Sequence, residues 1–133
     1  WSENLTTDQK QFTKKLFKNA SKIYEFPENY LDIFLAITSS GPAIIALIIE
    51  ALSDGGLSGG LQKILSEELV MEMILGTISL IKEKNITTLE LKNLVTSPGG
   101  TTISALRVLE KNSVRSALIE SIVSAYNRSK EFN

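Results

Sequence analysis

Residues 95–102 read Val95-Thr96-Ser97-Pro98-Gly99-Gly100-Thr101-Thr102, a stretch that predicts a tight turn opening a helix. Pro98 fixes φ and donates no backbone N–H, while Gly99 and Gly100 permit positive φ and close approach to the main chain. An apolar-periodic run begins at Ile103, so we expect a helix to start at the two threonines. The first N–H groups of a helix lack intrahelical partners and lie at the positive end of its dipole. Two interpretations follow from these residues: an interhelical turn with a threonine cap, or a site for a small anion such as a carboxylate.

The composition limits the chemistry that the chain can perform. Its 133 residues make one ordinary domain or a piece of a larger protein, and 43% of them are hydrophobic. The formal net charge is -1 and no basic stripe is present, so we expect no nucleic-acid binding. Cysteine and histidine are both absent, so we expect no disulfide, no thiolate nucleophile and no metal site. Hydroxyls, backbone amides, carboxylates and apolar surface remain.

Apolar residues recur at helical spacing over most of the sequence, and this pattern predicts an all-α fold. Two capping boxes mark helix starts, at Thr6 with Gln9 and at Thr87 with Glu90. Two connections between helices are expected, at residues 38–42 and at residues 54–60. The expected helices run from Thr7 to Asn19, Asn29 to Ile37, Pro42 to about Asp54, Gln62 to Lys84, Thr88 to near Val95, Thr101 to about Lys111, and from a cap at Ser113 through Arg128.

One short segment departs from the helical pattern. Ile23-Tyr24-Glu25-Phe26 is strand-like, and Pro27 ends it. An isolated strand is not stable alone, which suggests the edge of something that continues upstream. We therefore interpret residues 1–28 as the remnant of a preceding α/β domain and residues 29–133 as the helical domain.

The helix expected from Pro42 is apolar around almost its whole circumference. No charged residue occurs between Asp32 and Glu50, so a membrane-spanning helix is the alternative to a buried one. The apolar run is at the short limit for spanning, and hydroxyl residues, glycine and proline interrupt its middle. These features favour a buried helix over one that spans a membrane. A domain this small cannot cover such a helix on every side, so we expect a partner subunit to cover the rest of its apolar surface. Gly76, inside the long helix, is best explained by close contact with another helix.

Several motifs occur in a distinctive order. Ser40-Gly41-Pro42-Ala43 opens the apolar helix, which closes with Glu50-Ala51-Leu52-Ser53-Asp54-Gly55-Gly56, and Gly60-Leu61 starts the long helix. The turn at residues 95–102 follows, and behind it come Leu106, Leu109-Glu110, Arg115 and Arg128-Ser129. This order closely resembles the C-terminal dimerisation domain of pyrroline-5-carboxylate reductase, over roughly residues 30–132. Residues 1–26 resemble the last helix and strand of that family's N-terminal Rossmann domain.

The resemblance implies an all-α dimerisation domain of the 6-phosphogluconate-dehydrogenase-like C-terminal type, interlocked as a homodimer that could build a higher oligomer. It further implies a cytoplasmic enzyme of proline biosynthesis, which reduces 1-pyrroline-5-carboxylate to L-proline with NADPH or NADH. The nicotinamide cofactor would be bound mainly by the dinucleotide-binding domain. The fragment alone is therefore expected to dimerise but not to catalyse.

Carried over residue by residue, the resemblance places the substrate site in the turn. Ser97 and the backbone amides around Gly100, Thr101 and Thr102 would hold the substrate carboxylate. The hydroxyl of Thr102, the implied catalytic residue, would face the ring nitrogen, and Val95 would line the pocket through its backbone. The implied substrate-binding set is Val95, Ser97, Gly99, Gly100, Thr101 and Thr102.

Two features depart from the family pattern. The family usually has glycine between two serines before Gly-Pro-Ala, whereas this chain reads Thr38-Ser39-Ser40. The segment Ser58-Gly59-Gly60 also looks looser than usual. These departures keep a second interpretation open: a diverged reductase-like paralogue, of the type found among competence genes, that acts as a helical homodimer module without this activity.

Overall fold

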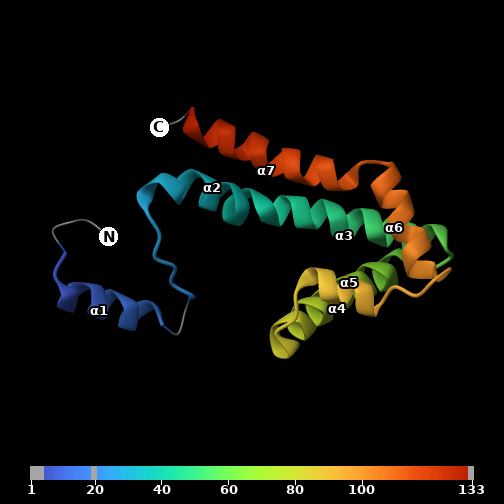
Figure 1. Cartoon of the computed structure of the whole chain (residues 1–133), viewed down its shortest axis with the longest axis horizontal. Coiled ribbons are helices and arrows are strands. Elements are labelled where there is room, and N and C mark those ends of the chain that lie inside the picture. Colours follow the sequence, from blue (N-terminus) through green and yellow to red (C-terminus); the bar gives the residue numbers. More distant parts are fainter. Residues whose placement is uncertain (1–4, 19–20, 132–133) are drawn as a thin grey trace. The chain divides into compact units, whose positions relative to one another are not determined.

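The computed structural model describes residues 5–18 and 21–131, and the chain divides into two units, Trp1–Asp32 and Ile33–Asn133. The described residues form helices joined by short connections and contain no strand, which confirms the expected all-α fold (Figure 1). In chain order the elements are α1 (Thr7–Phe17), η1 (Glu28–Tyr30), α2 (Leu31–Leu35), η2 (Ala36–Ser40), α3 (Gly41–Ser58), α4 (Lys63–Lys84), α5 (Thr88–Leu94), α6 (Thr101–Lys111) and α7 (Val114–Lys130).

The first unit contains α1, the segment that precedes η1, η1 itself and the first two residues of α2. The capping box predicted at its start is confirmed, because the Gln9 N–H donates to the Thr6 hydroxyl and the Thr6 N–H donates to the Gln9 side chain. The strand predicted for residues 23–26 is wrong: these residues lie in irregular chain, tied to α1 by an ion pair between Lys14 and Glu25. A strand needs a neighbour for its N–H and C=O groups, and the described part of the chain offers none. Assignment of residues 1–28 to a nucleotide-binding domain stays a prediction.

The interruption predicted at residues 38–42 takes an unexpected form. Instead of a break, a π-helical turn, η2, connects α2 directly to α3. Pro42 lies in the first turn of α3 and has no N–H, so the Thr38 carbonyl loses its usual donor four residues on. A wider turn accommodates that loss. The Thr38 hydroxyl donates to the Phe34 carbonyl at 2.8 Å.

The glycine-rich connection is also shorter than predicted. Residues 54–58 belong to α3, so the turn expected from Asp54 is confined to Gly59 and Gly60. The N–H of Gly59 closes the helix on the carbonyls of Gly55 and Gly56, each at 3.1 Å. Gly60 has φ 100°, a left-handed conformation that a side chain would strain, and the chain then reverses into α4.

The hairpin of α3 and α4 rests on a buried contact between two small residues. Ser53 and Ser66 are fully buried, and the Ser66 hydroxyl donates to the Ser53 carbonyl at 2.7 Å. Gly56 faces the same point, since a Cβ added there would lie 2.0 Å from the Ser66 hydroxyl oxygen. An exposed ion pair between Lys63 and Asp54 links the two helices at the loop end of the hairpin. Small residues therefore let α3 and α4 approach closely (Figure 1).

The C-terminal helices return along the apolar helix. α7 packs against η2, and α6 packs against α7. The predicted start of the last helix at Ser113 is correct, but the predicted side-chain cap is wrong, because the Ser113 hydroxyl makes no capping hydrogen bond. Ser113 has φ 56°, whereas a capping serine normally has extended backbone that aims its hydroxyl at the first amides.

The chain buries very little apolar surface by itself. Among the described residues Ala36 is the single buried hydrophobic residue, while Leu47 on α3 is 64% exposed and Ile64 on α4 is 83% exposed. A Cβ added at Gly76 has nothing within 4 Å in the described part of the chain, so the helix contact predicted for Gly76 is not made among those residues. The apolar faces of α3 and α4 therefore lack most of their cover.

The hairpin contact yields a matched pair of substitutions. Gly56→Ala should lower the free energy of unfolding by roughly 1–3 kcal/mol, because the new methyl group meets the Ser66 hydroxyl. Gly55→Ala, where an added Cβ has nothing within 4 Å, should instead raise it by up to about 1 kcal/mol through helix propensity. Urea unfolding at one fixed protein concentration measures both. Equal effects of the two substitutions would contradict the packing argument.

Candidate functional site

The turn between α5 and α6 is built by its proline and its first glycine. The N–H of Gly100 donates to the Ser97 carbonyl at 3.1 Å, which closes a four-residue turn. Pro98 occupies the second position, and Gly99 occupies the third with φ 69°. These are the features of a type II turn, which needs positive φ at its third residue. The sequence Ser-Pro-Gly-Gly is thus accounted for by backbone geometry.

Gly100 is the residue at which α6 begins. It has extended backbone, and no side chain caps the helix start. The threonine cap is therefore wrong, because Thr101 and Thr102 are the first two helical residues. A Cβ at Gly100 would lie 2.4 Å from the Ser97 hydroxyl oxygen, so that side chain folds over the glycine. The first N–H groups of α6 thus lie beside the Ser97 hydroxyl, an arrangement that suits an anion.

The predicted site residues come together as a short surface rather than a closed cavity. Val95 ends α5 and is more than half exposed, and Ser97 and Thr101 are exposed, whereas Thr102 is half-buried. The side chains of Ser97, Thr101 and Thr102 make no hydrogen bond to any residue that the structure describes. Three hydroxyls and a row of helix amides are therefore available, but the described residues do not enclose a ligand.

On the other side of the turn, Thr96 ties the chain to the end of α5. Its hydroxyl donates to the Lys92 carbonyl at 2.6 Å, and its N–H donates to the Asn93 carbonyl at 3.3 Å. Thr96 was not among the predicted site residues. A threonine four residues after a helical carbonyl, at a helix end, is the sequence signal that could have indicated this bond.

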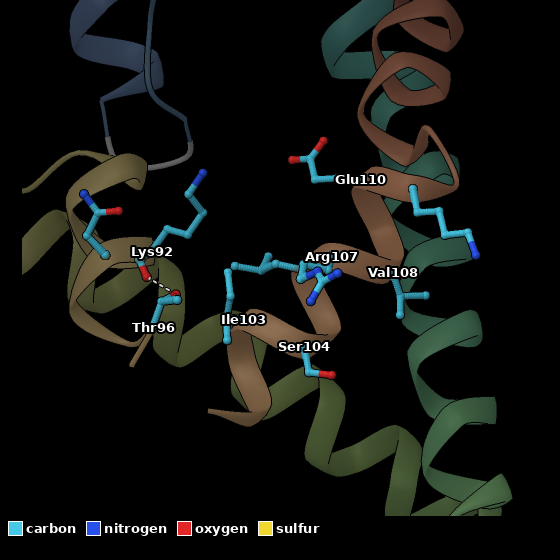
Figure 2. A pocket seen from close by; sticks show the side chains of 10 residues that line it. Lys92, Thr96, Ile103, Ser104, Arg107, Val108 and Glu110 are labelled. Atoms are coloured by element: carbon cyan, nitrogen blue, oxygen red, sulfur yellow. Dashed lines mark hydrogen bonds between the residues drawn. The ribbon is translucent and has the colours of Figure 1, made fainter. Parts of the chain in front are cut away.

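A groove lies between α5 and α6 next to the turn, and the sequence pattern did not indicate it. Its volume is about 660 Å³. Figure 2 shows the side chains that line it. The lining residues are Lys92, Asn93, Thr96, Ile103, Ser104, Leu106, Arg107, Val108, Glu110 and Lys111. The lining combines apolar side chains from α6 with three cations, Lys92 from α5 and Arg107 and Lys111 from α6.

Glu110 is the one acidic side chain on that groove. It forms an ion pair with Arg115, whose hydrogen bond lowers the pKa of Glu110, and the charge of Lys92 lowers it further. Glu110 is therefore negatively charged at neutral pH and largely engaged by Arg115. The three cations leave the groove positive overall, which favours the approach of an anion.

α5, which leads into the turn, starts with the second predicted capping box, and the prediction is confirmed. The Thr87 N–H donates to the Glu90 carboxylate at 2.7 Å, and the Glu90 N–H donates to the Thr87 hydroxyl at 3.1 Å. The hydrogen bond from the Thr87 backbone lowers the pKa of Glu90 most, and the bond from the Thr87 side chain lowers it further.

Among the residues that the structure describes, no group of three potential ligands could hold a metal ion.

These features define a class: an all-α domain whose apolar helices lack cover within one chain and whose α5–α6 turn suits an anion. The sequence profile of the family described as pyrroline-5-carboxylate reductase dimerisation matches residues 28–132. The chain belongs to this family.

Individual relatives agree with the assignment. The chain is 45% identical over 124 residues to a pyrroline-5-carboxylate reductase of Synechocystis, covering 93% of this chain and 46% of that protein. It is 38% identical to the Glycine max enzyme of the same name, covering 96% and 47%. It superimposes on a crystal structure of Plasmodium falciparum pyrroline carboxylate reductase with NADP bound, with TM-score 0.90 and 34% identity, over 98% of this chain and 52% of that one. The chain thus spans about half the length of the relatives it matches.

The capping box predicts a pH dependence. Because the folded-state pKa of Glu90 is lowered, its stabilisation is present above the unfolded-state pKa and is lost as pH falls through the folded-state pKa. Glu90→Gln keeps an acceptor but removes the charge, so its deficit in Tm should be largest near neutral pH and should vanish in acid. Glu83→Gln, at an exposed glutamate of α4 that caps nothing, is the control. A deficit that does not change with pH would contradict the charge argument.

Proposed function

We propose that this chain is the dimerisation and substrate-binding part of a pyrroline-5-carboxylate reductase, which reduces 1-pyrroline-5-carboxylate to L-proline with NADPH or NADH. The observation that carries the proposal is the start of α6, within a chain of this family: among the described residues, the side-chain hydroxyls of Ser97, Thr101 and Thr102 have no hydrogen-bond partner and no side chain caps the first amides of α6. The substrate bears a carboxylate beside a C=N bond. A helix start with flanking hydroxyls suits the carboxylate, and a hydroxyl that donates a hydrogen bond suits the nitrogen of the C=N bond.

Each residue of the turn has a role in the proposed reaction. The amides after Gly100, with the Ser97 hydroxyl, bind the carboxylate and orient the ring. The Thr102 hydroxyl hydrogen-bonds the ring nitrogen, which gains a proton when the C=N carbon gains hydride. Val95 lines the pocket at the end of α5. The positive groove next to the turn attracts the anionic substrate.

The nicotinamide cofactor supplies the hydride when bound. The glycines of the α5–α6 turn and of the α3–α4 connection follow helices, so neither has the strand that precedes a dinucleotide-binding turn. The described residues therefore do not fit a dinucleotide site, and we assign cofactor binding to the nucleotide-binding domain. NADP is bound in the Plasmodium falciparum relative, which supports a nicotinamide cofactor for the complete enzyme. This chain orients the substrate.

The proposal includes a homodimer in which a second copy covers the apolar faces of α3 and α4. The helical segment Glu28–Ser58 is long and apolar enough to cross a membrane by length and composition, because an 18-residue window within it has a mean hydropathy of 1.9. We favour a second copy because hydroxyl residues occupy the π-helical turn within that segment and because the matching family is described by its dimerisation. Only 6% of its most apolar window is buried within one chain, so the cover has to come from outside.

The enzymatic test uses the full-length protein that carries this chain, with pyrroline-5-carboxylate and NADPH. Thr102→Val and Ser97→Ala should each lower kcat/KM by about 10- to 100-fold, since each removes one positioned hydrogen bond to substrate. Ser121→Ala on α7, whose hydroxyl donates to the Leu118 carbonyl, is the matched control and should be unaffected. If the unmodified protein forms a dimer but never oxidises NADPH with this substrate, it is the reductase-like paralogue instead.

The dimer is tested at Gly76. Among the described residues, nothing lies within 4 Å of a Cβ added at Gly76, so the first carbon of a leucine there meets no neighbour within one chain. In an interlocked dimer the same side chain would be forced into a close helix contact, so we expect dissociation or a large loss of stability. Gly76→Ala, which adds one methyl group, is the control and should stay dimeric. Sedimentation that shows a well-folded monomer of the unmodified chain at micromolar concentration would contradict the proposal.

A further inference from the structure

Thr96 lies next to the proposed carboxylate site but outside the set of residues assigned to contact the substrate. We propose that Thr96 is a positioning residue, which anchors the substrate turn to the last carbonyls of α5 and so fixes where the amides of α6 point. The inference rests on the proposed function for its kinetic consequence. Its structural part, the anchoring of the turn, stands on the hydrogen bonds alone.

The anchor consists of bonds at the end of α5. The last carbonyls of a helix have no intrahelical donor and need another partner. The Thr96 hydroxyl donates to the Lys92 carbonyl at 2.6 Å, as Figure 2 shows, and the Thr96 N–H donates to the Asn93 carbonyl at 3.3 Å. The preceding residue, Val95, donates its N–H to the Leu91 carbonyl at 3.2 Å. The chain is thus held to α5 up to Thr96.

Beyond Thr96 the turn has only backbone support. Gly100 donates to the Ser97 carbonyl within the turn, and the Ser104 N–H donates to the Gly100 carbonyl at 3.3 Å as α6 begins. No side chain caps α6. Among the described residues, the bond from the Thr96 hydroxyl to the Lys92 carbonyl is therefore the one side-chain hydrogen bond that holds residues 96–102 in place.

The residue type fits this task. Thr96 is half-buried, and its β-branched side chain has few χ1 rotamers, so the hydroxyl is held toward the carbonyl four residues earlier. Valine has the same shape but leaves the Lys92 carbonyl without the hydroxyl donor. Serine retains the donor and loses only a methyl group. This pair of substitutions separates the hydrogen bond from packing.

The experiment compares Thr96→Val and Thr96→Ser in the full-length protein with Thr13→Val as control. Thr13 makes the same kind of bond, from its hydroxyl to the Gln9 carbonyl at 2.9 Å, but in α1. Thr96→Val should lower kcat/KM for pyrroline-5-carboxylate by about 10-fold or more, because small misplacement of a substrate site is costly. It should also speed hydrogen exchange at the Gly100 amide. Thr96→Ser should restore both, and the KM for NADPH and the dimer should not change in any variant.

Two readouts separate this inference from the proposed function. If the unmodified protein does not reduce pyrroline-5-carboxylate, the proposed function fails, and Gly100 amide exchange alone decides the anchoring role. Faster exchange in Thr96→Val but not in Thr96→Ser supports the anchor. Unchanged exchange in Thr96→Val, or equal defects in the valine and serine variants, would overturn it. A defect in Thr13→Val as large as that in Thr96→Val would also overturn it, because the effect would then be general.

Discussion

The hydrogen bond from the Ser66 hydroxyl to the Ser53 carbonyl sets the close approach of α3 and α4, and the rest of the helical unit is built on that hairpin. Both serines are fully buried, and Gly56 leaves just enough space for the Ser66 side chain. The Ser53 hydroxyl oxygen itself has no partner among the described residues, so only its backbone contributes to the bond. A polar contact between small residues, rather than interlocking large side chains, therefore positions the hairpin.

That hairpin leaves its large apolar side chains on the outside. One buried hydrophobic residue among the described residues cannot offset the conformational entropy lost when about a hundred residues order. A second copy that covers α3 and α4 supplies the missing burial. Close packing of a helix from that copy would also explain the open space at Gly76. Under this proposal the fold and the assembly are one process, because the helices that position the substrate turn are ordered only when the partner is present.

Much of this fold could be predicted from the sequence, because helical periodicity and capping residues act locally. Both capping boxes, the long α4 and the start of α6 follow from such local rules. The errors occur where local rules conflict with context. Gly55 and Gly56 look like turn residues but continue α3, since Gly56 is needed for contact with Ser66. Pro42 looks like a break, but a π-helical turn accommodates it within one continuous helix.

The same distinction applies to the candidate site. The residues of the turn are contiguous, so the sequence could place them together, and Pro98 with Gly99 was enough to predict a tight turn. The groove between α5 and α6 brings together side chains from two helices, and no local pattern indicates such a juxtaposition. The threonine-cap interpretation failed for a geometric reason: with Gly100 extended at the helix start, both threonines lie inside the helix. Because neither threonine hydroxyl caps the helix, both remain available to a ligand. The position of the threonines inside α6 therefore argues against the threonine cap and in favour of the anion site.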